Sequence, residues 1–136
     1  MNYWLMKTEP GTFSWADLEK AKTTTWDGVR NFQARTNLKT MEKGDIAFIY
    51  HSGDEKSIVG LAKISVGGYP DPNAKDWTVV DITFWKKIKR PVSLGEIKAT
   101  KSLANMVLVK NSRLSVQPVK KEEFEKVLEL SEEKSQ

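Results

Sequence analysis

Residues 45–88 read DIAFIYHSGDEKSIVGLAKISVGGYPDPNAKDWTVVDITFWKKI, and this stretch predicts three consecutive β-strands. Apolar side chains recur there at alternate positions, which is the period of a strand with one buried face. Because strands joined by short links pair antiparallel, we expect an antiparallel sheet at the centre of the fold. The expected strands lie in residues 45–52, 57–66 and 77–88.

The two links between these strands differ in composition. Residues 51–57, HSGDEKS, are few and mostly polar, and they predict a hairpin turn. Residues 67–76, GGYPDPNAKD, contain two glycines and two prolines. Because both residue types interrupt regular structure, this second link predicts a longer loop.

Shorter elements are expected on both sides of these strands. Residues 2–7 (NYWLMK) and 115–119 (SVQPV) predict strands, and residues 23–28 (TTTWDG) predict a loop. Long helices do not alternate regularly with the strands, which disfavours a parallel doubly wound sheet. The pattern favours an α+β fold in which short helices flank a curled antiparallel sheet or small open barrel.

Local capping signals place the helices. The S-x-x-D box at Ser14 and the S-x-x-E box at Ser93 each predict the start of a short helix. A further helix over residues 31–41 is expected to stop at Gly44. The last helix is expected to bury an apolar face made of Phe124, Val127 and Leu128.

The composition limits the classes of function. With 136 residues, 39% of them hydrophobic, the chain is long enough for one domain with its own core. It has no cysteine and a single histidine, so disulfides and a cysteine nucleophile are excluded, and we expect no metal and no cofactor. The formal net charge of +4 is compatible with an anionic partner.

The chain also lacks membrane and export signals. The first residues, MNYWLMKTEP, contain no long apolar run. No later segment approaches the roughly 20 apolar residues that a membrane-spanning helix needs. We therefore expect a soluble, intracellular protein of the cytoplasm that makes no membrane contact; a nuclear location is also compatible with the sequence.

Residues 26–35, WDGVRNFQAR, gather side chains suited to a flat ring and its phosphate. An indole can stack on a base, amides can reach its hydrogen-bonding edges, and guanidinium groups can neutralise phosphate. Asp27–Gly28 predicts a tight turn after Trp26, and a helix start near Asn31 would offer N–H groups to an anion. The alternative is that Trp26 belongs to the core and both arginines are solvated or ion-paired.

Other segments carry weaker signals, each with a structural alternative. His51 ends a strand, where it can meet a base edge or serve as an internal hydrogen-bonding group. Arg113 can clamp a phosphate or form an internal ion pair. Tyr69, held by Pro70, can border a pocket or pack onto its own turn. The basic run of residues 85–90, WKKIKR, can follow a nucleic-acid backbone or solvate one face.

Signals for catalysis are scarce. The chain contains no Walker A motif, no GxGxxG after a strand and no GxSxG. The adjacent carboxylates Glu122 and Glu123 are expected to face solvent. His51 has no Asp or Glu within its own YHS motif to orient it as a general base. Recognition of a flat ring is therefore better supported than a reaction.

Six motifs occur along the chain in the order WLMKTEP, WDGVRNFQAR, YHS, IVG, YPDP and SRLSV. On these motifs the chain resembles the EVE-domain family from residue 2 to residue 130. It departs from the family pattern at Phe32, where tyrosine is common, and at Ile58, where valine is common. The resemblance implies that residues 1–136 form a single EVE domain. It also implies a PUA-like fold, a small curled mixed or antiparallel β-barrel flanked by short helices, related to the YTH readers of methylated adenosine.

The resemblance further implies a pocket that takes in a modified nucleobase from DNA or RNA. Trp26 would form one wall, Arg30 and Asn31 would line the mouth, and cationic side chains would meet phosphates. We therefore expect a monomeric, non-enzymatic nucleic-acid-binding module that recognises a methylated or hydroxymethylated base. The residues expected to contact the ligand are Lys7, Trp26, Arg30, Asn31, Arg35, His51, Ser52, Tyr69, Pro70, Arg113 and Ser115.

Two other classes of function stay open on the sequence. A hydrolase acting on an extruded base would use His51 as its general base and would release a product. A protein-interaction module would present its aromatic loops to a partner protein. The sequence also leaves open which modification is read and whether DNA or RNA carries it.

Overall fold

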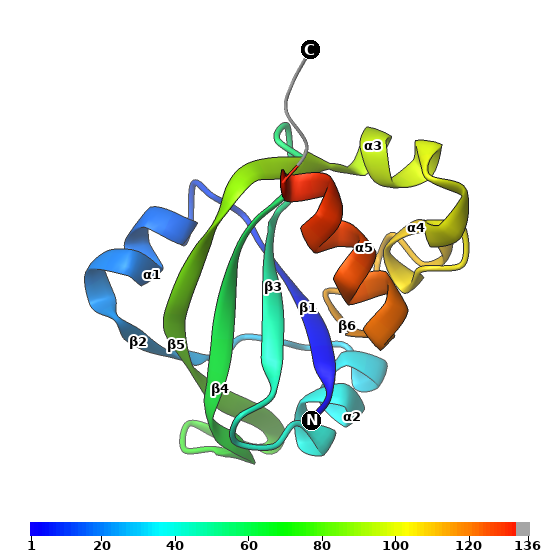
Figure 1. Cartoon of the computed structure of the whole chain (residues 1–136). Coiled ribbons are helices and arrows are strands. Elements are labelled where there is room, and N and C mark those ends of the chain that lie inside the picture. The colour runs from blue at the N-terminus through cyan, green and yellow to red at the C-terminus, as the bar shows by residue number, and fades with distance from the viewer. Residues whose placement is uncertain (133–136) are drawn as a thin grey trace.

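The computed structural model describes residues 1–132 and arranges them around one six-stranded sheet (Figure 1). The strands are β1 (Tyr3–Thr8), β2 (Thr23–Trp26), β3 (Ile46–His51), β4 (Ser57–Asp71), β5 (Ala74–Ser93) and β6 (Val116–Val119). They lie side by side in the order β2-β5-β4-β3-β1-β6. β1 and β3 run parallel and every other neighbouring pair is antiparallel, so the sheet is mixed.

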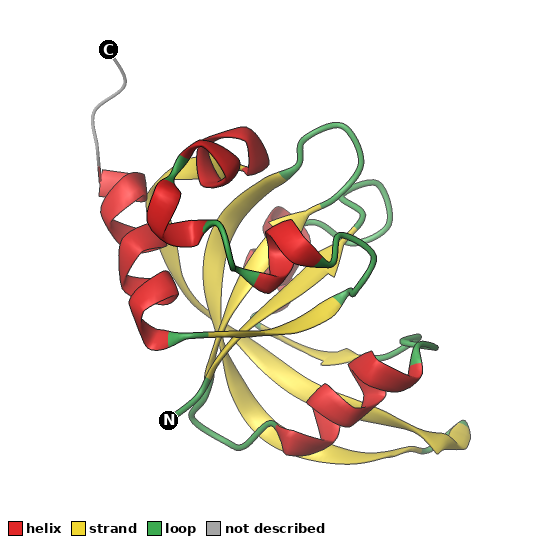
Figure 2. Ribbon diagram, turned by 90° about the vertical axis from the view of Figure 1, so that its right-hand side faces the viewer, coloured by secondary structure: helices red, strands yellow, loops and turns green. Residues whose placement is uncertain are grey.

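The sheet curls strongly, as Figure 2 shows. The long strands β4 and β5 pair through several register shifts, and irregularities of this kind increase the local twist of a strand pair. Within residues 1–132, β2 and β6 remain the two edges of the sheet and do not close it into a barrel. The expected α+β fold with a curled, open sheet is confirmed.

Short helices cover both faces of the sheet. They are α1 (Trp15–Ala21), α2 (Phe32–Thr40), α3 (Leu94–Ala99), α4 (Val107–Lys110) and α5 (Lys121–Glu132), with a 3₁₀ turn over Lys101–Leu103. α1 and α2 pack on one face, whereas α3, α4 and α5 pack on the other (Figure 1). None of the helices within residues 1–132 is long and apolar enough to cross a membrane.

β3 lies at the centre of this layered arrangement. All six of its residues are buried. Phe48 packs with the helices α3 to α5, and the next residue, Ile49, packs with the core under α1 and α2. A strand covered on both faces reads as a continuous apolar run, which is what residues 46–50 show.

Both predicted capping boxes are formed. Ser14 Oγ accepts a hydrogen bond from the Asp17 N–H at 3.1 Å, before α1. Ser93 Oγ accepts one from the Glu96 N–H at 3.1 Å, before α3. These helix starts follow from local sequence alone, because cap and partner are three residues apart.

α2 ends slightly before the position expected for it. The helix begins after Asn31, whose Oδ1 accepts from the Ala34 N–H at 2.9 Å. It ends at Thr40, and Met41 follows in an extended conformation. Gly44, which was expected to stop the helix, lies in the turn before β3 with a φ of 96°.

The prediction of a long loop over residues 67–76 is wrong. β4 and β5 continue through most of these residues and meet in a tight turn. Gly67 and Gly68 serve close packing there: a Cβ on them would stand 2.8 Å from Met41 O and 2.6 Å from Leu38 O. The two glycines therefore let the end of α2 lie directly on the sheet.

The predicted loop over residues 23–28 is also wrong for its first four residues. Residues 23–26 form β2, which pairs antiparallel with β5. Thr25 Oγ1 donates to Asp81 Oδ1 at 2.9 Å across this pair. Because β2 is an edge strand with exposed threonines, it has no apolar alternation by which the sequence could mark it.

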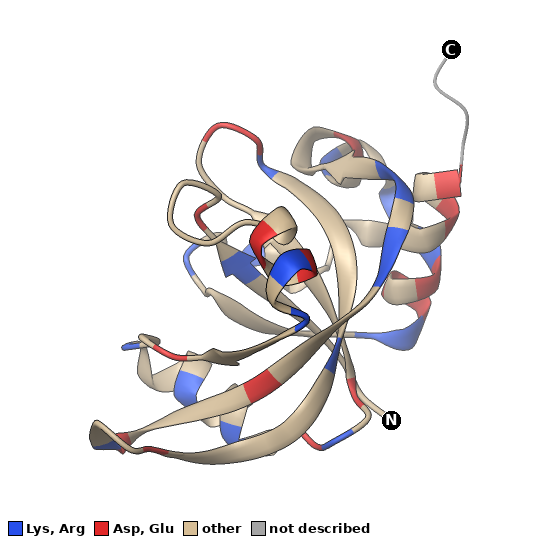
Figure 3. Cartoon of the chain, turned by 90° about the vertical axis from the view of Figure 1, so that its left-hand side faces the viewer, with Lys and Arg blue, Asp and Glu red and all other residues tan. Residues whose placement is uncertain are grey.

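The basic run of residues 85–90 is largely paired with acidic residues of the helices. Lys87 lies 3.2 Å from Glu19 of α1, and Lys89 lies 3.3 Å from Glu132 of α5. Figure 3 shows the basic residues of β5 beside the acidic residues of α5. Lysines of this run therefore form ion pairs that link α1 and α5 to the sheet.

Glu123, which was expected to face solvent, is buried instead, with an exposed fraction of 7%. Its Oε1 accepts a hydrogen bond from the Lys120 N–H at 2.9 Å. The carboxylate thus satisfies a backbone donor at the start of α5. Its neighbour Glu122 is exposed, as expected.

Candidate functional site

A pocket of about 430 Å³ opens where the end of β1 faces the end of β2. These strands are far apart in the strand order, and the curl of the sheet brings them to one hollow. Its volume lies within the range of small-ligand sites. The pocket is lined by Lys7, Thr8, Glu9, Thr12, Phe13, Thr24, Thr25, Trp26, Asp27, Gly28, Val29, Arg30 and Ser115.

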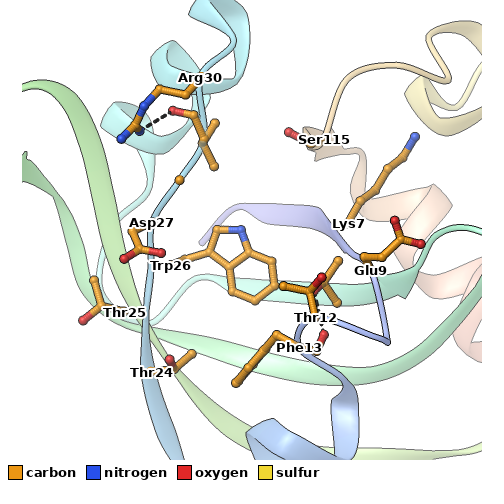
Figure 4. Close-up of a pocket in the computed structure, with 13 residues that line it drawn as sticks. Lys7, Glu9, Thr12, Phe13, Thr24, Thr25, Trp26, Asp27, Arg30 and Ser115 are labelled. Carbon is orange, nitrogen blue, oxygen red and sulfur yellow. Dashed lines mark hydrogen bonds between the residues drawn. The ribbon is translucent and has the colours of Figure 1, made fainter. Parts of the chain in front are cut away.

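The indole of Trp26 extends from the end of β2 into this pocket (Figure 4). The side chain is half-buried: it packs partly against the core beneath and remains partly open. Phe13 meets the indole edge to face, with ring centroids 6.3 Å apart and an interplanar angle of 85°. The core and pocket interpretations of Trp26 thus both hold in part.

Residues 27–31, after Trp26, belong to no helix, strand or turn, so the tight turn expected there is not formed. Gly28 has a φ of 77°, a conformation that glycine adopts without steric cost and most other residues avoid. This irregular segment lies between the end of β2 and the cap of α2 at Asn31. It places Asp27 and Arg30 on the same side of the indole (Figure 4).

Charged groups of both signs line the pocket. Lys7 and Glu9 lie on one side of the indole, and Arg30 and Asp27 lie on the other (Figure 4). The site therefore offers cationic donors and also anionic acceptors, which were not among the expected site residues. Within residues 1–132, no group of three or more His, Cys, Asp or Glu side chains is arranged to hold a metal ion.

Lys7 is held on the side away from the indole. Its Nζ donates to Ser112 O at 2.5 Å and lies 5.6 Å from the centroid of the Tyr50 ring. Burial lowers the pKa of the Lys7 ammonium below the ordinary lysine value. This cation is thus partly desolvated while its hydrogen bond goes to a neutral carbonyl.

Arg30 is more loosely held. Its Nη1 donates to Val29 O at 3.1 Å, and its Nη2 lies 4.0 Å from Asp71 Oδ2. The guanidinium carbon lies 5.3 Å from the centroid of the Trp77 ring. With 48% of the side chain exposed, Arg30 keeps donors free to meet an anion at the pocket mouth.

The segment that carries Glu9 and Phe13 is fixed by backbone hydrogen bonds. The N–H groups of Thr12 and Phe13 both donate to Glu9 O at 2.9 Å. Thr8 Oγ1 donates to Phe13 O at 2.6 Å, and the Ser52 N–H donates to Thr8 O at 2.9 Å. Ser52 thus supports the pocket wall from behind and does not line the pocket itself.

His51 is placed away from the pocket. It is buried, with an exposed fraction of 7%, and its Nε2 accepts from the Trp15 N–H at 2.9 Å. Its Nδ1 contacts Glu55 Oε2. The acidic partner that the YHS motif lacks is therefore supplied four residues later. Both ring nitrogens already have protein partners.

Asn31 and Arg35 lie beside the pocket, at the start of α2, and are not among its lining residues. Asn31 serves as the helix cap. The Arg35 guanidinium carbon lies 4.9 Å from the Phe32 ring centroid and 5.2 Å from that of Trp77. These two rings stack with centroids 5.4 Å apart. The result is an arginine–aromatic cluster next to Arg30.

The remaining expected residues also lie outside the pocket lining. Tyr69 Oη donates to Asp81 Oδ1 at 2.6 Å, and this hydrogen bond raises the pKa of the Tyr69 phenol. Pro70 is an exposed residue of β4. Arg113 is exposed and forms no ion pair with any residue of the described range 1–132.

Of the eleven expected residues, the structure brings four together in the pocket: Lys7, Trp26, Arg30 and Ser115. Sequence reasoning missed the carboxylates of Glu9 and Asp27 and the aromatic partner Phe13. Both carboxylates stand directly within the motifs MKTEP and WDG. Their closeness to Lys7 and Trp26 in the sequence could have indicated them, because residues one or two positions apart lie close together in space.

Comparisons with known proteins agree with this architecture. The family model described as the EVE domain matches residues 2–130. Human thymocyte nuclear protein 1 is 40% identical, over 96% of this chain and 74% of its own length.

Solved structures are similar over nearly the whole chain. The human THYN1 protein in complex with DNA containing 5-methylcytosine has a TM-score of 0.92 and 37% identity, covering 99% of this chain and 100% of that one. Protein Rpa0253 of Rhodopseudomonas palustris has a TM-score of 0.91 and 44% identity, covering 96% and 93%. The expected PUA-like fold is confirmed, and the chain belongs to the EVE-domain family.

Proposed function

We propose that this protein is a non-catalytic reader that takes a methylated or hydroxymethylated nucleobase of DNA or RNA into the Trp26 pocket. One observation carries the proposal: the indole of Trp26 is half-buried beside an open hollow of about 430 Å³. A planar heterocycle that enters this pocket can stack on the face of the indole. Polar groups stand around that face within the same pocket.

Stacking supplies the main attraction. Base–aromatic stacking contributes about 1–3 kcal/mol per base, while extrusion of a base from a duplex costs a few kcal/mol. The balance favours single strands, mismatches or lesions, where a base is already unstacked. Phe13 supports the indole edge to face, which fixes the ring plane before the ligand arrives.

The carboxylates give the pocket a preference among bases. Glu9 and Asp27 can only accept hydrogen bonds when ionised, and the exocyclic amino groups of cytosine and adenine are donors. A base that presents a carbonyl oxygen at that position would face repulsion. The pocket is therefore suited to an amino-bearing base, with Lys7 and Arg30 available for phosphate or carbonyl oxygens.

A methyl group adds a small further gain. Burial of one carbon group contributes about 0.8 kcal/mol, which corresponds to a preference of about fourfold over the unmodified base. The THYN1 structure in complex with 5-methylcytosine-containing DNA supports the same class of ligand. We therefore take 5-methylcytosine as the first probe.

The test compares four dissociation constants. Wild type and Trp26→Ala are each titrated with a single-stranded oligonucleotide carrying 5-methylcytosine and with its unmodified copy. Wild type should prefer the methylated strand by about fourfold. Trp26→Ala should lose about 5- to 150-fold in affinity, together with the preference. Equal affinity in all four measurements would end the proposal.

Trp85→Ala is the matched control. Trp85 is also half-buried, but it packs on the opposite face of the sheet and has Lys63 and Lys86 near its ring. This variant should keep both the affinity and the preference for the methylated strand.

The same titrations with RNA copies of the two strands show whether the pocket accepts ribose, deoxyribose or both. Release of a product that stops in His51→Ala would favour a hydrolase instead, and a protein partner that survives nuclease treatment would favour an interaction module.

A further inference from the structure

A second pocket, of about 400 Å³, adjoins the Trp26 pocket. Lys7 lines both pockets. The loop before β6 also reaches both, because Ser112 lines the second pocket and Ser115 lines the first. The two hollows are therefore neighbours along one surface, and a ligand longer than one base can occupy them together.

The wall between the pockets is thin. Gly53 lines the second pocket, and Glu9 lines the first. A Cβ on Gly53 would stand 2.7 Å from Glu9 Oε1, so the Glu9 carboxylate lies directly against this glycine. In Figure 4 the Lys7 side chain extends away from the indole, and its Nζ donates to the backbone carbonyl of Ser112, a residue of the second pocket.

The second pocket differs from the first in charge. Three lysines line it, Lys7, Lys56 and Lys98, and no carboxylate does. Within residues 1–132, none of the three forms an ion pair. The nearby Glu55 carboxylate is engaged with His51. Like charges gathered in one lining repel one another, and a bound anion relieves that repulsion.

The three lysines come from separate parts of the chain, and the fold brings them together. Lys7 comes from β1, Lys56 from the turn between β3 and β4, and Lys98 from α3. The turn is tied to α3, since the Leu94 N–H donates to Lys56 O at 2.8 Å. Lys7 is partly buried over the Tyr50 ring, and its pKa is lowered by that burial. A phosphate beside it would compensate its lost hydration.

We infer that the second pocket binds the backbone phosphate next to the nucleotide whose base enters the Trp26 pocket. This inference rests on the proposed function. It divides the work between the two hollows: the first contacts the base and senses its modification, and the second contributes affinity without regard to the base. Phosphate contacts position a nucleic acid and carry no sequence information directly.

The test removes two of the three lysine charges and leaves Lys7, which also lines the base pocket. Lys56 has a φ of 43°, a region that asparagine tolerates better than most residues. The double variant Lys56→Asn/Lys98→Gln therefore removes charge with little backbone strain. Lys39→Gln/Lys43→Gln is the matched control, because these two exposed lysines lie at the far end of α2 and in the turn that follows.

Affinity is measured against salt for the methylated and unmodified oligonucleotides. The slope of log K against log salt should fall by about 0.7 for single strands and about 0.9 for duplexes in the Lys56/Lys98 variant, because one phosphate contact is lost, and it should not fall in the control. The ratio of methylated to unmodified affinity should stay at the wild-type value. An unchanged slope, or an equal loss in the control, would overturn the inference.

Two further outcomes separate the inference from its premise. If Trp26→Ala leaves the methyl preference intact, the proposed function fails, whatever the lysines do. If inorganic phosphate binds wild type but not the Lys56/Lys98 variant, while the oligonucleotide slope is unchanged, the pocket holds free anions and the inference fails. Phosphate competing with the oligonucleotide, and only in proteins that retain both lysines, would support it.

Discussion

Trp26 and His51 both stand in motifs that suggested ligand contact, and the structure treats them in opposite ways. Trp26 is half-open to a pocket, whereas His51 is buried and each of its ring nitrogens has a protein partner. A side chain whose bonding capacity is already used within the fold has little left for a ligand. The two residues therefore differ in whether their side-chain atoms are free to contact a ligand, and this difference matters more than the residue type.

The largest expected effect falls on the His51 side of this comparison. A Cβ on Gly60 would stand 2.2 Å from the Trp15 ring, and the Trp15 N–H is the group that His51 binds. Gly60→Ala must therefore displace the ring, and overpacking of this kind lowers the free energy of unfolding by about 3 kcal/mol. Chemical denaturation measures it; a variant as stable as wild type would contradict the described packing.

His51→Ala should follow in size. The substitution leaves the partly buried backbone N–H of Trp15 without its acceptor, which costs about 1–3 kcal/mol of unfolding free energy. Because His51 does not line the pocket, the ratio of methylated to unmodified affinity should be unchanged in the folded variant. A folded variant that has lost the preference for the methylated strand and kept its stability would show that His51 contacts the ligand.

Much of the fold was predictable because its signals are local. The boxes at Ser14 and Ser93 lie within one helical turn, and the apolar run of residues 46–50 shows a strand covered on both faces. The strand continuation through Pro70 was not predictable. β3 pairs with β4 only as far as Lys63, so a proline beyond that point has β5 as its one partner and is tolerated. That tolerance depends on strand order, which no local pattern reveals.

The site was predictable in part for the same reason. Trp26 and Arg30 stand within one motif, whereas Lys7 and Ser115 join them only because β1 and the loop before β6 face β2 in the curled sheet. The resemblance to a family supplied that step. It did not predict Glu9 or Asp27, whose carboxylates are recognised as site residues only because they line the pocket.

Two carboxylates of the Trp26 pocket, Glu9 and Asp27, allow a test of which base the pocket prefers. Glu9→Gln and Asp27→Asn keep the shape of each side chain and remove its charge, so each should weaken binding of a 5-methylcytosine strand by about 1 kcal/mol, or about fivefold. A strand with thymine at that position should not lose affinity, because thymine has no exocyclic amino group. Equal losses for the two strands would show that the carboxylates do not read the base edge.

The smallest effect is expected at the arginine–aromatic cluster. Phe32 is 66% exposed and stacks on Trp77, with Arg35 over its ring. Phe32→Ala should lower the free energy of unfolding by about 1 kcal/mol, the sum of a modest ring pair and a solvent-exposed cation–π contact. Thermal unfolding monitors this. A methyl preference that disappears in Phe32→Ala would extend the base site beyond the Trp26 pocket.

The central claim is that a base lies on the indole of Trp26, and the indole N–H resonance of that residue tests it most directly. Trp4 is the internal reference, because its buried Nε1–H donates to Asp45 Oδ2 at 3.0 Å, away from the pocket. In a nuclear magnetic resonance titration with the 5-methylcytosine strand, the Trp26 resonance should shift and saturate while that of Trp4 stays in place. A Trp26 resonance that does not move when the strand is fully bound would contradict the account.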